Sequence, residues 1–234
     1  MAAPYRLHYA PDNASLAVRL ALEELGQPYD AALVDRARAA QKSPAYLALN
    51  PAGLIPVLET PAGAIFETAA ILLWLADRHG ALAPAPDAPE RGDFLKWLFF
   101  ASNTLHAGLR MLFHPTPFVG EDAAAGQALR DRMGAALAGH WGHVEAAAAA
   151  RTAWLGAGAP SALDLYLAPL LRWSALYPEG GTGWFRLDDY PHLRTMAAGL
   201  ETRPSVAAAV AAEGLGPLPF TAPRLATPPE GSAT

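Results

Sequence analysis

The segment 50–75 carries the residue types that would bind a small peptide. Pro51 and Gly53 are typical of a turn, and Pro56 then begins an apolar run at a position where a strand tolerates the missing N–H of proline. A cis bond before Pro56 would suit such a turn. It would leave the backbone N–H and C=O of Ile55 unpaired, so that an extended peptide could bind there as an added strand does.

The same segment adds a site for a charged head group. Glu67 and Thr68 follow a short predicted strand, residues 64–66, and open a helix. The first N–H groups of that helix and the Thr68 hydroxyl favour an anion, whereas the Glu67 carboxylate beside them favours an ammonium. An amino acid head group carries both charges. We therefore expect Ile55, Pro56, Glu67 and Thr68 to hold a short peptide by its backbone and its amino acid head.

The sequence contains no cysteine, which limits its chemistry. Disulfides, thiolate zinc sites and attack by a protein thiol are excluded, so any thiol chemistry must belong to a ligand. The seven histidines lack ligand partners at diagnostic spacing, and we expect no metal site. No phosphate-binding loop or dinucleotide fingerprint is present either.

The order of these motifs resembles the cytosolic glutathione transferases, and the likeness covers nearly the whole chain. It rests on the runs 50–59 and 67–72 and on the segment 161–164 far downstream. Further matches point most closely to the bacterial beta class: Tyr9-Ala10-Pro11, residues 105–109, residues 171–173, Arg203-Pro204 and residues 212–215. The resemblance implies that the peptide is glutathione, acting as co-substrate, and that the protein is a homodimer.

The N-terminal half mixes short strands and helices. We expect strands at 5–9, 29–34, 56–59 and 64–66, and helices at 15–25, 44–49 and 68–79. A βαβ unit followed by ββα gives one mixed four-stranded sheet, because the first crossover is right-handed and the second pair forms a hairpin. The resemblance implies a thioredoxin-like fold for this α+β domain, residues 1–79.

The rest of the chain is predicted to be helical. A proline-rich linker, residues 80–90, leads to an all-α domain, residues 91–216, with helices at 94–111, 123–149, 161–177, 193–201 and 205–213. Ser161 and Asp164 have the spacing of a capping box, which we interpret as structural rather than catalytic. The proline-rich tail, residues 217–234, is expected to be poorly ordered or wrapped on the domain.

Activation of a bound thiol needs a hydrogen-bond donor near the first helix. Lowering a thiol pKa of about 8.5 by two units takes roughly 2.7 kcal/mol, and one donor to a charged sulfur supplies about 1.5 to 3 kcal/mol. In the family alignment the beta-class cysteine falls on Ala14 and the serine of theta-like relatives falls near Asp12, whose charge would oppose a thiolate. Asn13 and Ser15 remain, either as thiol donors or only as helix caps; we favour Ser15.

His106 is the other catalytic candidate, because its surroundings match the beta-class segment whose histidine lines the cleft. A charge on it near pH 7 would assist thiolate formation or bind an acidic electrophile. Asn103 and Thr104, one turn earlier, are expected to reach glutathione. The expected walls for a hydrophobic electrophile are Phe113, His114, Phe118, Tyr166 and Trp173. We assign the aromatic cluster Phe94, Trp97, Phe99 and Phe100 to the core and the dimer interface.

The composition of the chain limits the kinds of partner that it can bind. A net charge of −5 and a pI near 5.8 give no basic surface for nucleic acid or anionic lipid. No apolar run approaches the ~20 residues of a membrane span, and no leader is evident, so we expect a cytoplasmic protein. The function expected from the resemblance is conjugation of glutathione to a hydrophobic electrophile. Glutathione-dependent reduction of a peroxide or disulfide, or ligand binding without catalysis, are the alternatives.

Overall fold

The computed structural model describes residues 4–150 and 152–233. Its N-terminal part contains the predicted sheet, with strands β1 (Tyr5–Tyr9), β2 (Tyr29–Leu33), β3 (Val57–Thr60) and β4 (Gly63–Phe66) in the order β2-β1-β3-β4. β1 and β2 are parallel, whereas β3 is antiparallel to both β1 and β4. This is the mixed sheet expected from the βαβ-ββα order, and it confirms the thioredoxin-like fold.

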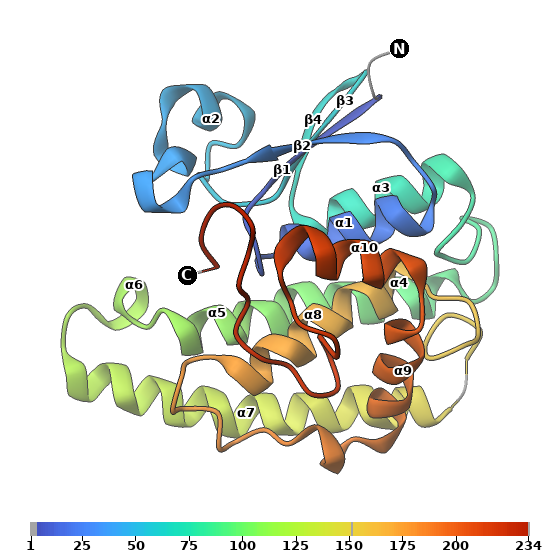
Figure 1. Ribbon diagram of the computed structural model, residues 1–234. Helices are drawn as coiled ribbons and strands as arrows, with labels where there is room; N and C mark the ends of the chain where they lie inside the picture. The colour runs from blue at the N-terminus through green and yellow to red at the C-terminus, as the bar shows by residue number, and fades with distance from the viewer. Residues whose placement is uncertain (1–3, 151, 234) are drawn as a thin grey trace.

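Helices cover both faces of this sheet. α1 (Ser15–Glu24) and α3 (Thr68–His79) lie between the sheet and the helical domain, and the short α2 (Pro44–Leu49) lies on the outer face (Figure 1). The alternation of a strand explains the division, because successive side chains point to opposite faces. Leu7 and Leu58 thus join the large core with α1, whereas Val57 packs with Tyr46 of α2.

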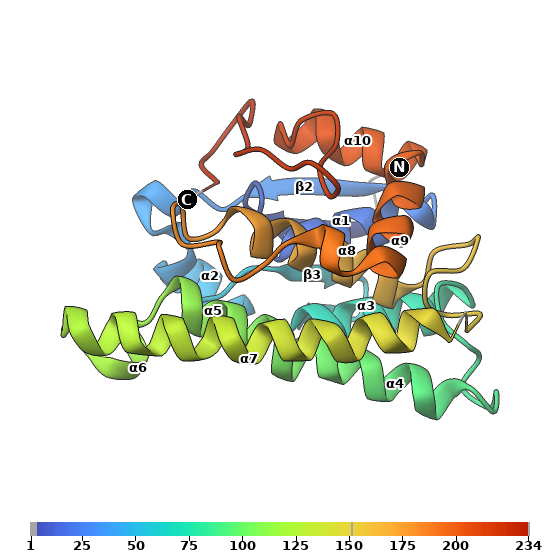
Figure 2. The same cartoon turned by 90° about the horizontal axis from the view of Figure 1, so that it is seen from below.

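The described residues of the C-terminal part form mainly helices joined by loops. Its helices are α4 (Arg91–Phe100), α5 (Ala107–Phe113), α6 (Thr116–Val119), α7 (Ala123–Ala149), α8 (Ala162–Leu176), α9 (Pro191–Glu201) and α10 (Pro204–Glu213). α8 lies in the interior of the molecule (Figure 2), packed against α1 and α3 of the N-terminal part and against α4 and α5, which is why its residues from Ala162 to Ser174 are all buried. None of the described helices is long and apolar enough to cross a membrane.

The capping box begins α8 as expected. The Ser161 hydroxyl accepts hydrogen bonds from the N–H groups of Leu163 and Asp164, and the Asp164 carboxylate accepts one from the Ser161 N–H at 2.9 Å. Asp164 also accepts the N–H of Gly156, which fixes the preceding loop. Burial raises the pKa of Asp164 to about 6. Both residues are therefore structural, holding the start of a buried helix.

Several elements of the structure are not predicted by the sequence patterns. Among the described residues, three short 3-10 helices occur at Arg36–Arg38, Ala40–Lys42 and Leu187–Asp189. The helix predicted at 94–111 extends to 91–113 and is interrupted by a π-helical segment, Ala101–His106. Such segments occur mostly as interruptions of α-helices, frequently at functional sites.

The tail packs against the domain. Phe220 is buried, and the N–H groups of Phe220 and Thr221 bind the Glu201 carboxylate. The tail then returns past Gly214, whose carbonyl accepts the Thr227 N–H at 2.9 Å. A side chain at Gly214 would collide with this backbone, since its Cβ would lie 2.1 Å from the Thr227 oxygen. The tail therefore packs first on the helical domain, and its end lies against the N-terminal domain, where the Arg36 guanidinium donates to the Ala233 carbonyl at 3.1 Å.

Candidate functional site

The sheet register brings the segments of the candidate site to one end of the sheet. His8 of β1 pairs with Val57, and Val57 pairs with Phe66 on its other side. One step further along the strands, the turn after β1 therefore lies beside the residue before Val57 and beside the start of α3. The predicted thiol, peptide and head-group positions share one edge.

The peptide position has the expected backbone geometry. The bond between Ile55 and Pro56 is cis. No described residue hydrogen-bonds to the N–H or C=O of Ile55, whereas the Leu54 carbonyl accepts from the Tyr46 hydroxyl and the Asn50 amide, both at 2.8 Å. The loop is thus fixed by its neighbours while the Ile55 backbone keeps one donor and one acceptor for a ligand.

A lysine accompanies this loop. Gly53 has a φ of +61°, and a Cβ there would lie 2.9 Å from the Lys42 Nζ. Gly53 is required by its backbone conformation and by the close approach of residues 41 and 42. Lys42, at the end of the second 3-10 helix, therefore places an ammonium beside the Ile55 loop. Nothing in the local sequence pattern predicts that approach.

The head-group position has an unusual backbone. Glu67 has φ 73° and ψ 116°, outside the regions that residues other than glycine normally occupy, and its side chain is exposed. Such a conformation costs of order 1–3 kcal/mol and clusters at ligand sites. Thr68 follows as the first, buried residue of α3. An exposed carboxylate next to the positive end of a helix is the arrangement that suits an amino acid head.

Asn13 is the one partly exposed side chain in the stretch from Tyr9 to Leu22. Its Oδ1 accepts the Ala14 N–H at 2.8 Å, and no described residue bonds to its Nδ2. The Ser15 hydroxyl is fully buried, donates to the Ala10 carbonyl at 3.1 Å and accepts the Ala10 N–H at 3.3 Å. Ser15 therefore fixes the turn from within, and Asn13 presents the donor that a ligand can reach.

Asp12 is buried in an ion pair between the domains. Its carboxylate accepts from Arg172 Nε at 2.8 Å and Nη2 at 2.9 Å, from Trp173 Nε1 at 2.8 Å and from the Tyr177 hydroxyl at 3.0 Å. Its own N–H donates to Glu213 at 2.8 Å. The charge of Asp12 is thus balanced by Arg172, and it opposes a nearby thiolate much less than the sequence suggested.

His106 lies at the junction of the two domains, in a group of hydrogen-bonding side chains. Its Nδ1 lies 2.8 Å from the Tyr166 hydroxyl, and its ring packs 5.6 Å from that of Trp173. The hydroxyls of Ser102 and Thr68 lie close enough to lower the pKa of Tyr166, although burial raises it more. Desolvation, with a smaller effect of Arg110, lowers the pKa of His106 to about 4. The imidazole is neutral at pH 7, so the expected positive charge there is corrected.

The other expected residues separate into two groups. Tyr166 and Trp173 are buried behind the junction, whereas Phe113 is half-buried and His114 and Phe118 are exposed. Asn103 is exposed and Thr104 half-buried on the π-helical segment. A separate hollow of about 800 Å³ contains none of these residues and lies between α7 and the loop after α8, lined by Leu112, Arg130, Gly134, Glu179 and Trp184 among others.

The chain is similar to known proteins along most of its length. Residues 14–78 match the family described as glutathione S-transferase, N-terminal domain, and residues 127–195 match the glutathione S-transferase, C-terminal domain. A glutathione S-transferase of Xanthomonas campestris, GST-4.5, is 32% identical over 212 residues, covering 90% of this chain and 99% of the relative. The chain belongs to the glutathione S-transferase family.

Solved structures of family members agree. A sphingomonad glutathione S-transferase complexed with glutathione has a TM-score of 0.73 and 32% identity, covering 90% of this chain and 100% of that one. A Burkholderia graminis glutathione transferase, with two glutathione molecules bound per subunit, has a TM-score of 0.76 and 26% identity, covering 91% and 89%. Glutathione is therefore the co-substrate of the family, and the structure shows no metal-binding cluster among its described residues.

Two residues that the sequence motifs did not assign to the site support it from the helical domain. Arg172 and Glu213 are buried charges whose contacts with Asp12 fix the turn beside Asn13. A sequence signal for Arg172 exists, because it is a charged residue in a helix that is largely apolar after Asp164, and so needs a partner. Its partner lies 160 residues away, and no local pattern identifies it.

Proposed function

We propose that this protein is a glutathione transferase that conjugates the glutathione thiolate to a small hydrophobic electrophile. The observation that carries the proposal is the unpaired backbone of Ile55 at the same sheet end as Glu67 and Asn13. One tripeptide thereby meets a backbone pairing position, a head-group position and a thiol donor. Relatives of similar length bind glutathione, which supports the choice of ligand.

Each part of glutathione has a complementary group in this proposal. The cysteinyl backbone pairs with the N–H and C=O of Ile55. The γ-glutamyl ammonium binds the Glu67 carboxylate, and its carboxylate binds the Thr68 hydroxyl and the first N–H groups of α3. Lys42 faces the remaining carboxylate, that of glycine. Asn103 and Thr104 reach the ligand from the helical domain.

Asn13 is the proposed thiol donor, with Ser15 supporting it. The exposed Nδ2 donates to the sulfur, and the start of α1 adds a favourable dipole. Ser15 holds the Ala10 backbone through both its hydrogen bonds, so it acts on the turn and not on the sulfur. The Arg172 pair removes most of the repulsion from Asp12.

The chemistry is a displacement by sulfur. The thiol proton leaves to solvent, the thiolate forms a bond to the electrophilic carbon, and the leaving group departs with the bonding electron pair. Neutral His106 does not supply a positive charge for this step. Holding the thiolate near the electrophile therefore provides most of the rate enhancement.

Glutathione titration tests this assignment. We expect binding by calorimetry, an ultraviolet thiolate signal in the complex below the pH at which free glutathione ionises, and turnover of 1-chloro-2,4-dinitrobenzene. Binding with a thiolate signal but no conjugation would favour reduction chemistry. Binding with neither signal nor turnover would leave a ligand-binding module, and no binding would refute the site.

Glutathione-dependent disulfide reduction is the second candidate, because the Burkholderia graminis relative holds two glutathione molecules per subunit. In that reaction one glutathione thiolate attacks a disulfide sulfur, the other sulfur leaves as a thiolate, and a second glutathione releases oxidised glutathione. A coupled assay that measures oxidised glutathione separates this reaction from conjugation, which forms none.

We also propose a homodimer in which exposed aromatic residues of α4 meet the partner. Phe99 is 47% exposed, and Trp97 and Phe100 of the same helix are half-buried, with their ring centroids 5.2 Å apart. Phe94, in contrast, is fully buried in the core. Aromatic residues are enriched in protein interfaces, which supports this assignment. Sedimentation at micromolar concentration tests the dimer.

A further inference from the structure

The end of the C-terminal tail lies against the turn that leads to the proposed thiol donor. Its residues 225–233, here called the strap, contact the turn after β1 at two places. The Tyr9 hydroxyl, at the end of β1, donates a hydrogen bond to the Glu230 carboxylate. Gly231 packs on the turn itself, since a Cβ added to it would lie 3.3 Å from the Pro11 Cδ. Glu230 lies 221 positions from Tyr9, so only the fold brings the strap to this turn.

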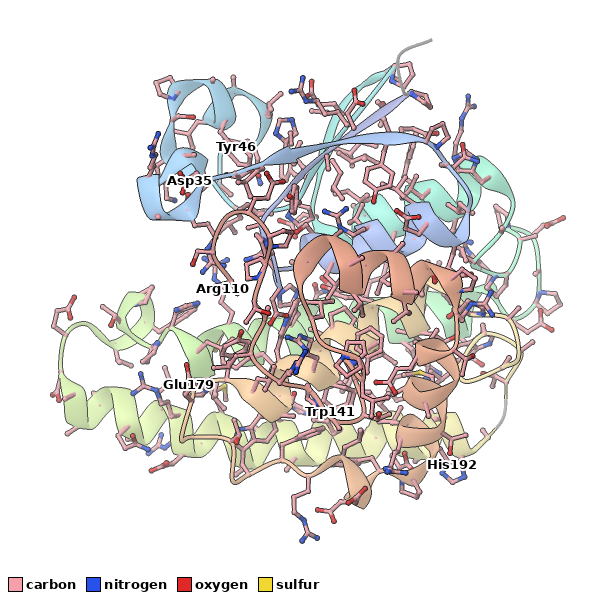
Figure 3. All side chains as sticks on the ribbon, viewed as in Figure 1. Asp35, Tyr46, Arg110, Trp141, Glu179 and His192 are labelled. Atoms are coloured by element: carbon pink, nitrogen blue, oxygen red, sulfur yellow. The ribbon has the colours of Figure 1, made fainter. Side chains whose placement is uncertain are left out.

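The strap is tied at both of its ends. Directly before it, the carbonyl of Arg224 accepts a hydrogen bond from Arg172 at 2.8 Å. At its far end, the Arg36 guanidinium donates to the Ala233 carbonyl at 3.1 Å, and Figure 3 shows this end close to the segment that begins at Asp35. The strap therefore crosses the turn from the helical domain to the first 3-10 helix of the N-terminal domain.

Between and after these two contacts, the turn is held from within the domains. Ser15 binds the Ala10 backbone through both its hydrogen bonds, and Arg172 binds the Asp12 carboxylate. Asp12 has a φ of 49°, a conformation that residues other than glycine keep only when their surroundings impose it. The turn is thus supported at each of its four positions, two of them by the strap, and the partly exposed Asn13 follows directly after it.

Glu230 has two opposite effects on a thiol beside this turn. The other charged side chains that contact the turn or the strap are Asp12, Arg19, Arg36, Arg172 and Glu213. Arg172 pairs with Asp12, and Arg19 pairs with Glu213. The negative charge of Glu230 by itself would raise the pKa of the thiol. Its hydrogen bond to Tyr9 would lower that pKa, because it holds the turn from which Asn13 donates to the sulfur. The two effects therefore differ in sign.

We propose that Glu230 is a positioning residue for the glutathione thiol. By binding Tyr9 it holds the strap on the turn, and the turn then keeps the Asn13 amide directed at the sulfur. Glu230 acts through the turn and does not touch the reacting atoms. It lies outside both segments that match the family, residues 14–78 and 127–195. The inference rests on the proposed conjugation, and it makes the end of the tail part of the N-terminal site.

Two substitutions separate the hydrogen bond of Glu230 from its charge. Glu230→Gln keeps an oxygen that accepts from the Tyr9 hydroxyl but removes the charge, whereas Glu230→Ala removes both. The thiol pKa is measured from the thiolate absorbance of the glutathione complex. Glu230→Ala should raise it by about half a unit, less than the loss of the donor itself, and Glu230→Gln should not raise it. If Glu230 acts by its charge alone, both variants should lower the pKa, which would overturn the inference.

The pH profile of kcat/KM with 1-chloro-2,4-dinitrobenzene distinguishes positioning from a general loss of stability. Half a pKa unit is about threefold in thiolate fraction below the pKa, so Glu230→Ala should lose about threefold there and little above the pKa. A variant that is only less stable would lose activity equally at every pH. Tyr9→Phe keeps the ring and should reproduce the Ala profile, and the double variant should add nothing. Glu121→Ala, which removes an exposed glutamate before α7, is the control and should leave the profile unchanged.

Hydrogen exchange in the free protein tests the strap without turnover. The Thr227 N–H donates to the Gly214 carbonyl and the Asp12 N–H donates to Glu213, so their exchange rates report on the strap and on the turn. Glu230→Ala should speed exchange at both positions and leave the rates within α7 unchanged.

The outcomes separate this inference from the proposed function. An unchanged exchange rate at Asp12, or a lowered thiol pKa in Glu230→Ala, overturns the inference even if the enzyme turns over. If the wild type forms no thiolate with glutathione, conjugation fails as the function. Exchange then decides about the strap alone: faster exchange at Asp12 in Glu230→Ala supports its hold on the turn, and an unchanged rate refutes it.

Discussion

Replacing Asn13 tests which group stabilises the thiolate. Asn13 is the partly exposed donor of the turn, and its Nδ2 bonds to no described residue. A hydrogen bond to a charged acceptor is worth about 1.5 to 3 kcal/mol, and one pKa unit equals about 1.4 kcal/mol. Because Asn13 is partly exposed, we take the lower end and expect Asn13→Ala to raise the pKa of the bound thiol by about one unit.

Two other variants make the experiment specific. Asn13→Asp keeps the size of the side chain but adds a negative charge, so it should raise the thiol pKa further than Asn13→Ala. Ser15→Ala should leave the thiol pKa near its original value. It should nevertheless lower the free energy of unfolding by about 1–3 kcal/mol, since the Ala10 carbonyl loses a buried partner.

The assay is the pH dependence of the thiolate absorbance in the glutathione complex, together with the pH profile of kcat/KM. Glutathione affinity at low pH, where the thiol is neutral in every variant, serves as the control for binding. A shift with Ser15→Ala and none with Asn13→Ala would refute the reasoning and make Asn13 only a cap of α1. If neither variant shifts the pKa, backbone N–H groups must hold the thiolate.

Four further predictions address binding, stability and assembly. Glu67→Gln should weaken glutathione binding by about 1.5 to 3 kcal/mol in calorimetry, because a charge-assisted contact to the ammonium is lost; unchanged affinity would place the ligand elsewhere. Arg172→Met should lower the urea-derived unfolding free energy by about 3–5 kcal/mol, since the Asp12 charge stays buried without its partner, and Asp12→Asn in the same chain should restore part of it. Burial raises the pKa of Glu213 to about 7 from 4.5, so the stability it contributes is full below pH 4.5 and is lost as the pH rises through 7; Glu213→Gln should reduce the fall in thermal stability between pH 5 and pH 8. Phe99→Glu should convert the dimer to monomer in sedimentation, and a wild-type monomer would contradict the proposed interface.

The sequence predicted much of the peptide position because its signals are local. The turn residues before Pro56 and the change from strand to helix at Glu67 need only neighbouring residues to be recognised. The sheet order likewise follows from the handedness of one crossover and one hairpin. The π-helical segment around His106 could not be predicted in this way, because it has the composition of an ordinary helix.

Local sequence signals do not identify the residue that donates to the thiol. The sequence offers both Ser15 and Asn13 as donors at the start of the same helix, and it favours Ser15. Only the packed structure distinguishes them, by burying the Ser15 hydroxyl against Ala10 and leaving Asn13 partly exposed. Burial depends on every element that covers a residue, so the sequence around a turn does not determine it.

The sequence by itself determined the elements, their order and the absence of a protein thiol, because hydrophobic periodicity, turn residues and composition are properties of short segments. The tertiary structure decided which charged groups are paired and which titratable groups are neutral. Asp12 and Arg172 lie 160 positions apart, and each is unfavourable in its own segment until the fold joins them. The same folding step desolvates His106 and keeps its imidazole neutral at pH 7. Electrostatic character at the site is a sum over distant segments, and it exists only once the two domains are packed together.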